Sequence, residues 1–218
     1  MINYLFSNPL LFFVYLISLL ISLSIHEFSH AWVADYLGDP TARLQGRLTL
    51  NPKAHIDIFG MIFLLLFGFG WGKPVPVDAF NLKNPRKDTL WISLAGPTSN
   101  FILAILLSIV LRLFILFKLQ FIFTISLVVI VFLIRMNIVL GIFNLLPISP
   151  LDGFKVVEGL LPEEKAREWA GLERLGFIFL LALIFPIGNS SLLDNILGPV
   201  SNFITNLLFP LSLTGGII

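Results

Sequence analysis

Long apolar stretches restrict the fold of this sequence more than any other feature. Five of them are apolar enough to lie in lipid, and a weaker sixth follows near 191–209. The five cover 9–34, 58–70, 89–117, 121–146 and 171–187. With 57% hydrophobic and 12% charged residues, the chain is too apolar to be an ordinary soluble domain. We therefore expect an all-α polytopic membrane protein with about four to six transmembrane or re-entrant helices.

Two segments between the first and third stretches depart from this helical pattern. Segment 43–50 alternates leucine with polar residues, and a period of two is typical of a β-strand. Segment 68–84 is rich in glycine and proline, so it cannot be helical throughout and is expected to be extended or turning. We expect the two to form a small β-strand or hairpin element at the cytoplasmic membrane edge.

The lysines and arginines indicate how the chain is oriented. Seven of the fourteen lie between residues 38 and 88, four lie between 151 and 175, and none precedes residue 9. The positive-inside rule places the first two regions in the cytoplasm and the N-terminus outside. Stretch 58–70 must then start and finish inside, which makes it re-entrant or shallow. Neither the net charge of +1 nor any basic patch indicates a nucleic-acid partner.

The first apolar stretch ends in the sequence His-Glu-Phe-Ser-His, residues 26–30. On a helix, His26 and His30 lie about one turn apart on one face, so both can bind a single metal ion, and Glu27 can act on metal-bound water. At about 1.5 Å per residue from Leu10, His26 lies roughly 24 Å into a hydrocarbon core about 30 Å thick. A costly ionisable cluster at that depth indicates a function. The alternatives are a chance match and a degenerate site without catalysis.

Two histidines leave a catalytic zinc site one protein ligand short. Cysteine is absent, so the third ligand must come from His, Asp, Glu or Asn. Stretch 121–146 leads to Asp152, which the topology brings to the same membrane face as His30. Asp152 is the best candidate, although an Asp-Gly pair after a helix is also an ordinary turn. Four competitors lie in a segment that looks like a solvated amphipathic helix: Glu158, Glu163, Glu164 and Glu168.

Four further polar residues call for an interpretation. Asn100 and Asn144 lie near the cytoplasmic ends of apolar stretches. Each amide can stabilise an oxyanion or bind substrate backbone, or it can make a helix cap or an interhelical hydrogen bond. For His55 we favour a surface or loop-ordering role over metal binding. Arg135 interrupts an apolar stretch, and we expect it to reach the membrane interface or to pair with another helix.

Three motifs, in this order, resemble those of the site-2 proteases, the zinc intramembrane metalloproteases of peptidase family M50, in their short form without a PDZ domain. Residues 26–30 are similar to the first motif of that family, and residues 96–100, Gly-Pro-Thr-Ser-Asn, to its middle motif. Residues 144–153 are similar to its Asn-x-x-Pro-x-x-x-Leu-Asp-Gly motif. One departure is Phe154, where many relatives carry a small residue, and it concerns substrate fit rather than metal binding.

This resemblance, which covers about residues 8–160, implies the roles of the site residues. His26, His30 and Asp152 would bind one Zn²⁺ ion, Glu27 would be the catalytic acid and base, and the substrate would be a transmembrane segment of another protein. The function expected is that of a zinc-dependent intramembrane endopeptidase. The alternative is a catalytically silent zinc-binding scaffold or a metal-handling membrane protein.

The expected organisation is a single domain over residues 1–218, with a core at 8–160 and C-terminal helices at 161–218. We expect it in a prokaryotic cell membrane, with the site near the cytoplasmic face. A substrate helix hides its backbone in hydrogen bonds, so it must unwind locally before it is cut. We expect the unwound segment to add as an extra strand to segment 43–50.

Overall fold

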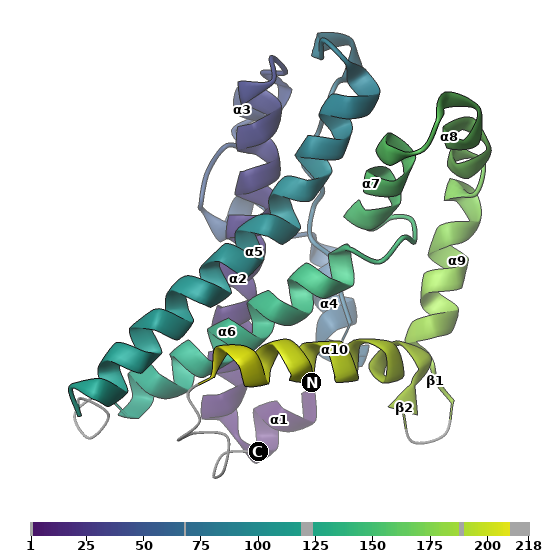
Figure 1. Cartoon of the computed structure of the whole chain (residues 1–218). Helices are drawn as coiled ribbons and strands as arrows, with labels where there is room; N and C mark the ends of the chain where they lie inside the picture. The colour runs from purple at the N-terminus through teal and green to yellow at the C-terminus, as the bar shows by residue number, and fades with distance from the viewer. Residues whose placement is uncertain (1, 68, 119–123, 188–189, 210–218) are drawn as a thin grey trace.

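The computed structural model describes residues 2–67, 69–118, 124–187 and 190–209. Within them the chain is almost entirely helical (Figure 1). The helices are α1 (Ile2–Ser7), α2 (Pro9–Tyr36), α3 (Thr41–Leu44), α4 (Ile58–Phe67), α5 (Pro85–Leu116), α6 (Thr124–Asn144), α7 (Asp152–Leu160), α8 (Glu163–Ala170), α9 (Glu173–Ile184) and α10 (Leu192–Leu208). Two short 3₁₀ turns, Pro52–Ala54 and Ala79–Asn81, and an antiparallel pair of two-residue strands, β1 (Pro186–Ile187) and β2 (Ser190–Ser191), complete the described part.

Three of the described helices are long and apolar enough to cross a membrane: α2, α5 and the part of α6 from Ser126 to Asn144. At about 1.5 Å per residue they measure roughly 42, 48 and 28 Å, against a hydrocarbon core of about 30 Å. Helix α5 packs against both α2 and α6. The prediction of an all-helical membrane protein is confirmed, whereas the count of four to six spanning or re-entrant helices stays a prediction. The expected start of stretch 121–146, residues 121–123, lies outside the described residues.

Helix α4 is too short to cross the bilayer. Its ten residues measure about 15 Å, half the thickness of the hydrocarbon core. The chain on both sides of α4 leads back to the end of the bundle at which α2 ends and α5 begins (Figure 1). This course agrees with a re-entrant or shallow path for stretch 58–70.

The strand predicted at 43–50 is wrong. Residues 41–44 form the single turn α3, and the chain then turns through Gly46, which has a positive φ of 67°. The strand was predicted on the assumption that the leucines of this segment are buried and its polar side chains exposed. Leu44 and Leu50 are 78% and 57% exposed, while Arg47 between them is only 5% exposed. Leu44 and Leu50 therefore point outward and the arginine points in, which is the reverse of the usual pattern.

The glycine- and proline-rich connector before α5 is non-helical, as predicted, apart from the 3₁₀ turn at Ala79–Asn81. Its middle is extended, and a single β-bridge joins Gly72 to Ile56. Beside that bridge, the N–H of Lys73 donates to the oxygen of His55 at 2.8 Å. Arg47 donates to the backbone oxygens of Lys73 and Pro74 at 2.5 and 3.1 Å. The connector is thus held by the bridge to Ile56 and by one buried guanidinium instead of the expected partner strand.

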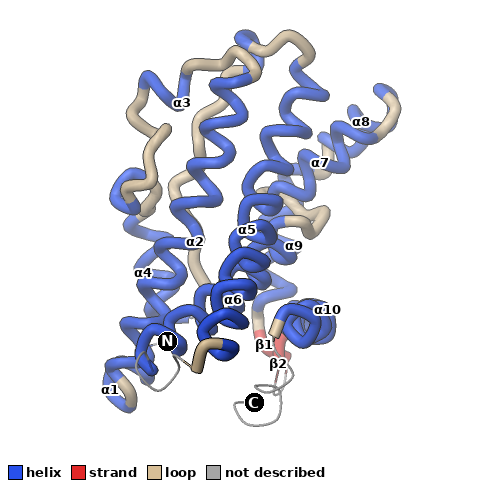
Figure 2. Tube along the Cα trace, turned by 60° about the vertical axis from the view of Figure 1, so that its left-hand side comes forward, coloured by secondary structure: helices blue, strands red, loops and turns tan. Residues whose placement is uncertain are grey.

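Helix α10 lies across the bundle. It runs across the long helices in Figure 1 and is seen nearly end-on in Figure 2. Arg112 and Ser108 of α5 both donate to the oxygen of Leu208 in its last turn. The guanidinium of Arg135 in α6 lies 5.7 Å from the ring centroid of Phe209. Arg135 thus pairs with the segment that follows another helix, in line with one of the two roles expected for it.

Candidate metal centre

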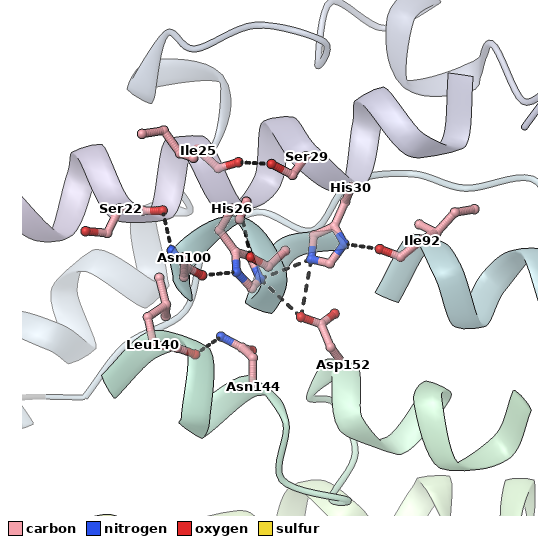
Figure 3. Close-up of polar contacts among 12 residues, drawn as sticks. Ser22, Ile25, His26, Ser29, His30, Ile92, Asn100, Leu140, Asn144 and Asp152 are labelled. Carbon is pink, nitrogen blue, oxygen red and sulfur yellow. Dashed lines mark hydrogen bonds and ion pairs between the residues drawn. The ribbon is translucent and has the colours of Figure 1, made fainter. Parts of the chain in front are cut away.

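Three potential metal ligands from two distant parts of the chain meet inside the bundle. His26 and His30 lie on successive turns of α2, and Asp152 is the first residue of α7 (Figure 3). The Nε2 atoms of the two imidazoles are 3.0 Å apart, and Asp152 Oδ2 lies 3.1 Å from one and 3.3 Å from the other. Ligands placed about 2.0–2.1 Å from a tetrahedral zinc lie about 3.3 Å from one another. The triangle therefore has nearly the size of one face of a zinc coordination tetrahedron.

The hydrogen bonds on the other side of the imidazoles show that the triangle consists of lone pairs. His30 Nδ1 lies 2.6 Å from the backbone oxygen of Ile92, which can only accept, so Nδ1 carries the proton. His26 Nδ1 lies 2.6 Å from Asn100 Oδ1 and is protonated for the same reason. When each imidazole is neutral, both Nε2 atoms present lone pairs to Asp152 Oδ2, a buried oxygen without a hydrogen-bond donor among the described residues. Three convergent lone pairs repel one another unless a cation lies between them, so these residues fit a zinc ion.

Two glycines allow the helices to approach this closely. A Cβ atom at Gly96 of α5 would lie 2.4 Å from His30 Nε2 and 2.6 Å from His26 Cε1. A Cβ atom at Gly153, next to the aspartate, would lie 2.2 Å from the backbone oxygen of Leu145. Both contacts are shorter than van der Waals distance, so a side chain at either position would push α5 or α7 away from the donor triangle.

A polar network extends from His26 into the middle of the bundle. The amide nitrogen of Asn100 donates to the backbone oxygen of Ser22 at 3.2 Å and to Asn137 Oδ1 at 2.8 Å. Asn137 in turn donates to Ser22 Oγ and to the backbone oxygen of Leu133, each at 2.8 Å. All these side chains are buried. Both amide hydrogens of Asn100 are therefore used between helices, which is the interhelical alternative left open for this residue.

A cavity of about 600 Å³ opens beside the donor triangle. Its wall includes Glu27, which lies close enough to His30 and Arg47 to interact electrostatically with both. The connector residues Pro74, Val75 and Val77 also line the cavity. Asn144 also lines the cavity, and one of its amide hydrogens is donated to the oxygen of Leu140 at 3.0 Å.

The remaining residues singled out from the sequence lie elsewhere. His55 is buried, donates from Nε2 to the backbone oxygen of Thr49 at 2.7 Å, and lies outside the cluster of described residues that can hold a metal ion. Phe154 is buried, and its ring stacks on Trp169 with centroids 5.2 Å apart. The indole of Trp169 also donates to the oxygen of Phe154 at 3.0 Å. The bulk of Phe154 is thus used to pack α7 against α8.

Sequence reasoning overlooked Asn137. It interrupts the apolar stretch 121–146 seven residues before Asn144, so the signal was an uncharged amide within an apolar helix. The charged Arg135, two residues before it, was interpreted instead. The role of Gly96 was also overlooked, because a glycine in a helix gives no sign of what lies opposite it.

Fold and site together define a class: an integral membrane protein built around one metal centre. A family model described as peptidase family M50 matches residues 14–126 and 116–183. YwhC of Bacillus subtilis (strain 168), provisionally named a zinc metalloprotease, is 42% identical over 186 residues, or 83% of this chain and 85% of YwhC. Rip2 of Mycobacterium tuberculosis, with the same provisional name, is 35% identical over 170 residues, or 75% of this chain and 63% of Rip2. The chain therefore belongs to peptidase family M50.

A third relative, the zinc metalloprotease MJ0392 of Methanocaldococcus jannaschii, is 28% identical over 160 residues, which cover 72% of this chain but only 37% of MJ0392. No solved structure gives a significant match. Family membership and the names of these relatives make the chain a zinc metalloendopeptidase, with zinc as its cofactor.

Proposed function

We propose that this protein is an intramembrane endopeptidase that hydrolyses peptide bonds within or near the transmembrane segments of other membrane proteins. The observation that carries the proposal is the position of the donor triangle. Two of its three members lie on α2, which is long and apolar enough to span the bilayer, and the third is brought to them by the turn after α6, a second such helix. A peptide bond cut at this site would have to be presented from within or beside the membrane.

In this proposal His26, His30 and Asp152 hold the zinc ion. Bound zinc supplies Lewis acidity, which activates water and polarises a peptide carbonyl. Glu27 takes the proton released when water attacks the carbonyl and returns it to the leaving amine. Its position beside His30 in the wall of the cavity supports this role.

The two asparagines receive different roles. Asn144 lines the cavity and has a second amide hydrogen that can be donated to a substrate carbonyl, so we assign it to substrate binding or oxyanion stabilisation. Asn100 is fully buried and gives both amide hydrogens to neighbouring helices. We therefore assign it to the orientation of His26 instead of contact with substrate.

The substrate segment would bind unwound in the 600 Å³ cavity. The extended connector at Pro74 to Val77 supports this, because it offers backbone along one wall to a chain that has given up its own helical hydrogen bonds. Segment 43–50, which forms no strand, does not serve as the docking edge. Its contribution is Arg47, which holds the connector in place.

We further propose that the chain forms one domain over residues 1–218 in a prokaryotic cell membrane, with its N-terminus outside and the zinc site near the cytoplasmic face. The distribution of lysine and arginine supports this orientation. The described residues at the cytoplasmic end would include α3 and α8, which lie at the same end of the molecule in Figure 1.

The test uses the full-length protein in detergent or proteoliposomes with a transmembrane test substrate, with and without a zinc chelator. We expect cleavage that the chelator stops and added zinc restores. Glu27→Gln should abolish cleavage and retain zinc, whereas His26→Ala and Asp152→Ala should lose both, as measured by elemental analysis of the purified proteins. Undiminished cleavage by Glu27→Gln would refute the role of Glu27.

A catalytically silent zinc-binding scaffold is not favoured, because the relatives are named as zinc metalloproteases and Glu27 is present. Zinc bound without cleavage of any transmembrane substrate would nevertheless support it.

A further inference from the structure

Asn137 is the most deeply buried polar side chain of α6 and has no contact with the donor triangle. It lies in the middle of a membrane-spanning segment and is 0% exposed. An uncompensated amide in such an apolar setting costs several kcal/mol, on the order of 2–7. The structure shows what compensates it.

Every hydrogen-bonding group of the Asn137 amide has a partner. Its nitrogen donates to Leu133 O and to Ser22 Oγ, and its oxygen accepts from Asn100 Nδ2. Leu133 O is a backbone carbonyl and can only accept, so the Asn137 nitrogen must point toward it. The Asn137 oxygen is thereby fixed toward Asn100.

This oxygen in turn determines which way Asn100 faces. With Asn137 Oδ1 and Ser22 O as acceptors, both amide hydrogens of Asn100 point away from the zinc site. Asn100 Oδ1 is then left to accept from His26 Nδ1, 2.6 Å away. If the Asn100 amide turned over, its NH₂ group would face the His26 N–H, and its oxygen would face two other oxygens.

We propose that Asn137 is a positioning residue for the zinc ligand His26 and acts through Asn100. It touches neither metal nor substrate. By fixing the Asn100 amide it holds the His26 ring so that Nε2 points into the donor triangle. The inference rests on the proposed role of His26 as a zinc ligand.

The measured quantity is the zinc affinity of the purified full-length protein in detergent, from competition with a chromophoric chelator. Loss of a hydrogen-bond partner behind a metal ligand typically weakens binding about 10- to 100-fold. Asn137 stands one residue further away, so we expect Asn137→Leu to weaken zinc binding about tenfold, at the low end of that range. Burial favours the protonated form of Asn137→Asp, which still presents an oxygen to Asn100 and can donate its O–H to Leu133 O, so zinc binding should stay within about threefold of the wild type.

A second arm separates positioning from general destabilisation. In an Asn100→Ala background, Asn137→Leu should weaken zinc binding no further, because the residue through which it acts is gone. Ser108→Ala is the matched control: it removes another buried interhelical hydrogen bond of α5, to Leu208 in α10, and should leave zinc affinity unchanged. If Asn137→Leu cannot be purified, Asn137→Ala removes the same oxygen without added bulk.

Wild-type zinc affinity in Asn137→Leu overturns the inference. So does an equal loss in Asn137→Leu and Asn137→Asp, or a full further loss in the Asn100→Ala background. These outcomes differ from failure of the proposed function, in which the wild-type protein itself would show no zinc-dependent cleavage.

Discussion

Gly96 of α5 faces His30 of α2 so closely that a methyl group at residue 96 would lie 2.4 Å from the Nε2 atom of the imidazole. A Cβ atom cannot occupy that position unless α5 or the ring moves. We expect Gly96→Ala to weaken zinc binding by at least about tenfold, as displacement of a ligand's support commonly does. Cleavage should fall in parallel. Zinc content and affinity of the purified variant, measured by elemental analysis and chelator competition, check this outcome.

Gly198→Ala in α10 provides the control. A Cβ atom there would meet no atom within 4 Å, so the substitution should leave zinc binding unchanged. Alanine in a helix interior is favoured over glycine by about 0.5–1 kcal/mol, so the melting temperature should stay the same or rise. Wild-type zinc affinity in Gly96→Ala would show that α5 can yield at this point.

Among the described residues of segment 43–50, Arg47 is the one whose side chain hydrogen-bonds to the connector. Its guanidinium donates to two consecutive backbone oxygens there. Burial lowers the pKa of Arg47, and the carboxylate of Glu27 partly opposes that shift. Lysine cannot reproduce the forked pair of hydrogen bonds. We expect Arg47→Lys to reduce kcat/KM for a transmembrane test substrate at least about tenfold, because a shifted cavity wall misplaces the substrate.

Zinc affinity should be retained in Arg47→Lys, since the arginine contacts no ligand. Arg43→Lys is the matched control, because Arg43 is exposed and makes an ion pair with the partly exposed Asp35. Such pairs contribute little, about 0–1 kcal/mol. If both variants cleave the substrate like the wild type, the connector does not depend on Arg47.

Asn100 and Asn144 should give different defects on substitution by leucine. Asn144 lines the cavity, so Asn144→Leu should lower kcat/KM by roughly 100-fold, the cost of losing a donor to a developing oxyanion, with zinc affinity unchanged. Asn100 is bonded to His26, so Asn100→Leu should weaken zinc binding about 10- to 100-fold. Kinetics at saturating zinc and chelator competition separate the two. The reverse pattern would exchange the assigned roles.

Asp39, in the turn after α2, is expected to make the stability of the protein depend on pH in the acid range. Burial by itself raises its pKa, but hydrogen bonds from Thr41, Asn81 and the N–H of Asp78 outweigh it and hold the pKa below the ordinary value. A lowered folded-state pKa gives stability that is fully present above the unfolded-state value of about 3.9 and lost as the pH falls through the folded-state pKa.

We therefore expect the melting temperature of the wild type to decrease when the pH is lowered below about 4. Asp39→Asn should show less of this acid-dependent loss of stability. At pH 7 that variant should be less stable by about 1–3 kcal/mol. The NH₂ group of the asparagine replaces a carboxylate oxygen that accepts hydrogen bonds, so one of the donors around residue 39 loses its acceptor. Asp35→Asn is the control, with at most about 1 kcal/mol expected at pH 7. Identical pH profiles for Asp39→Asn and wild type would exclude this contribution.

The sequence was sufficient to predict the three long apolar helices α2, α5 and α6 and the donor triangle. Helices in lipid must be long and apolar, and two histidines four residues apart must share a face, so both features follow from local spacing. The third ligand was predicted from the topology, because the distribution of lysine and arginine placed Asp152 at the same membrane face as His30. These predictions needed only the path of the chain and no knowledge of side-chain packing.

The failures concern features that depend on packing. Leu44, Arg47 and Leu50 alternate as in a strand, but the leucines are exposed and the arginine is buried against the polar backbone of the connector, which reverses the usual meaning of that pattern. Asn137 carries no motif and no charge, and its importance becomes visible only when α5 and α2 are placed against α6. Local sequence does not encode which side chain will face which across three helices.

The bonded amides of Asn100 and Asn137 also bear on how the helices assemble. In a bilayer, apolar side chains pack against lipid almost as well as against one another, so hydrophobicity alone does not choose how far one helix slides along the next. Sliding α6 by one turn, about 5.4 Å, would separate both amides from their partners in an apolar environment. The same asparagines that lie behind His26 therefore favour a single register for α2, α5 and α6, the register in which His26 faces Asp152.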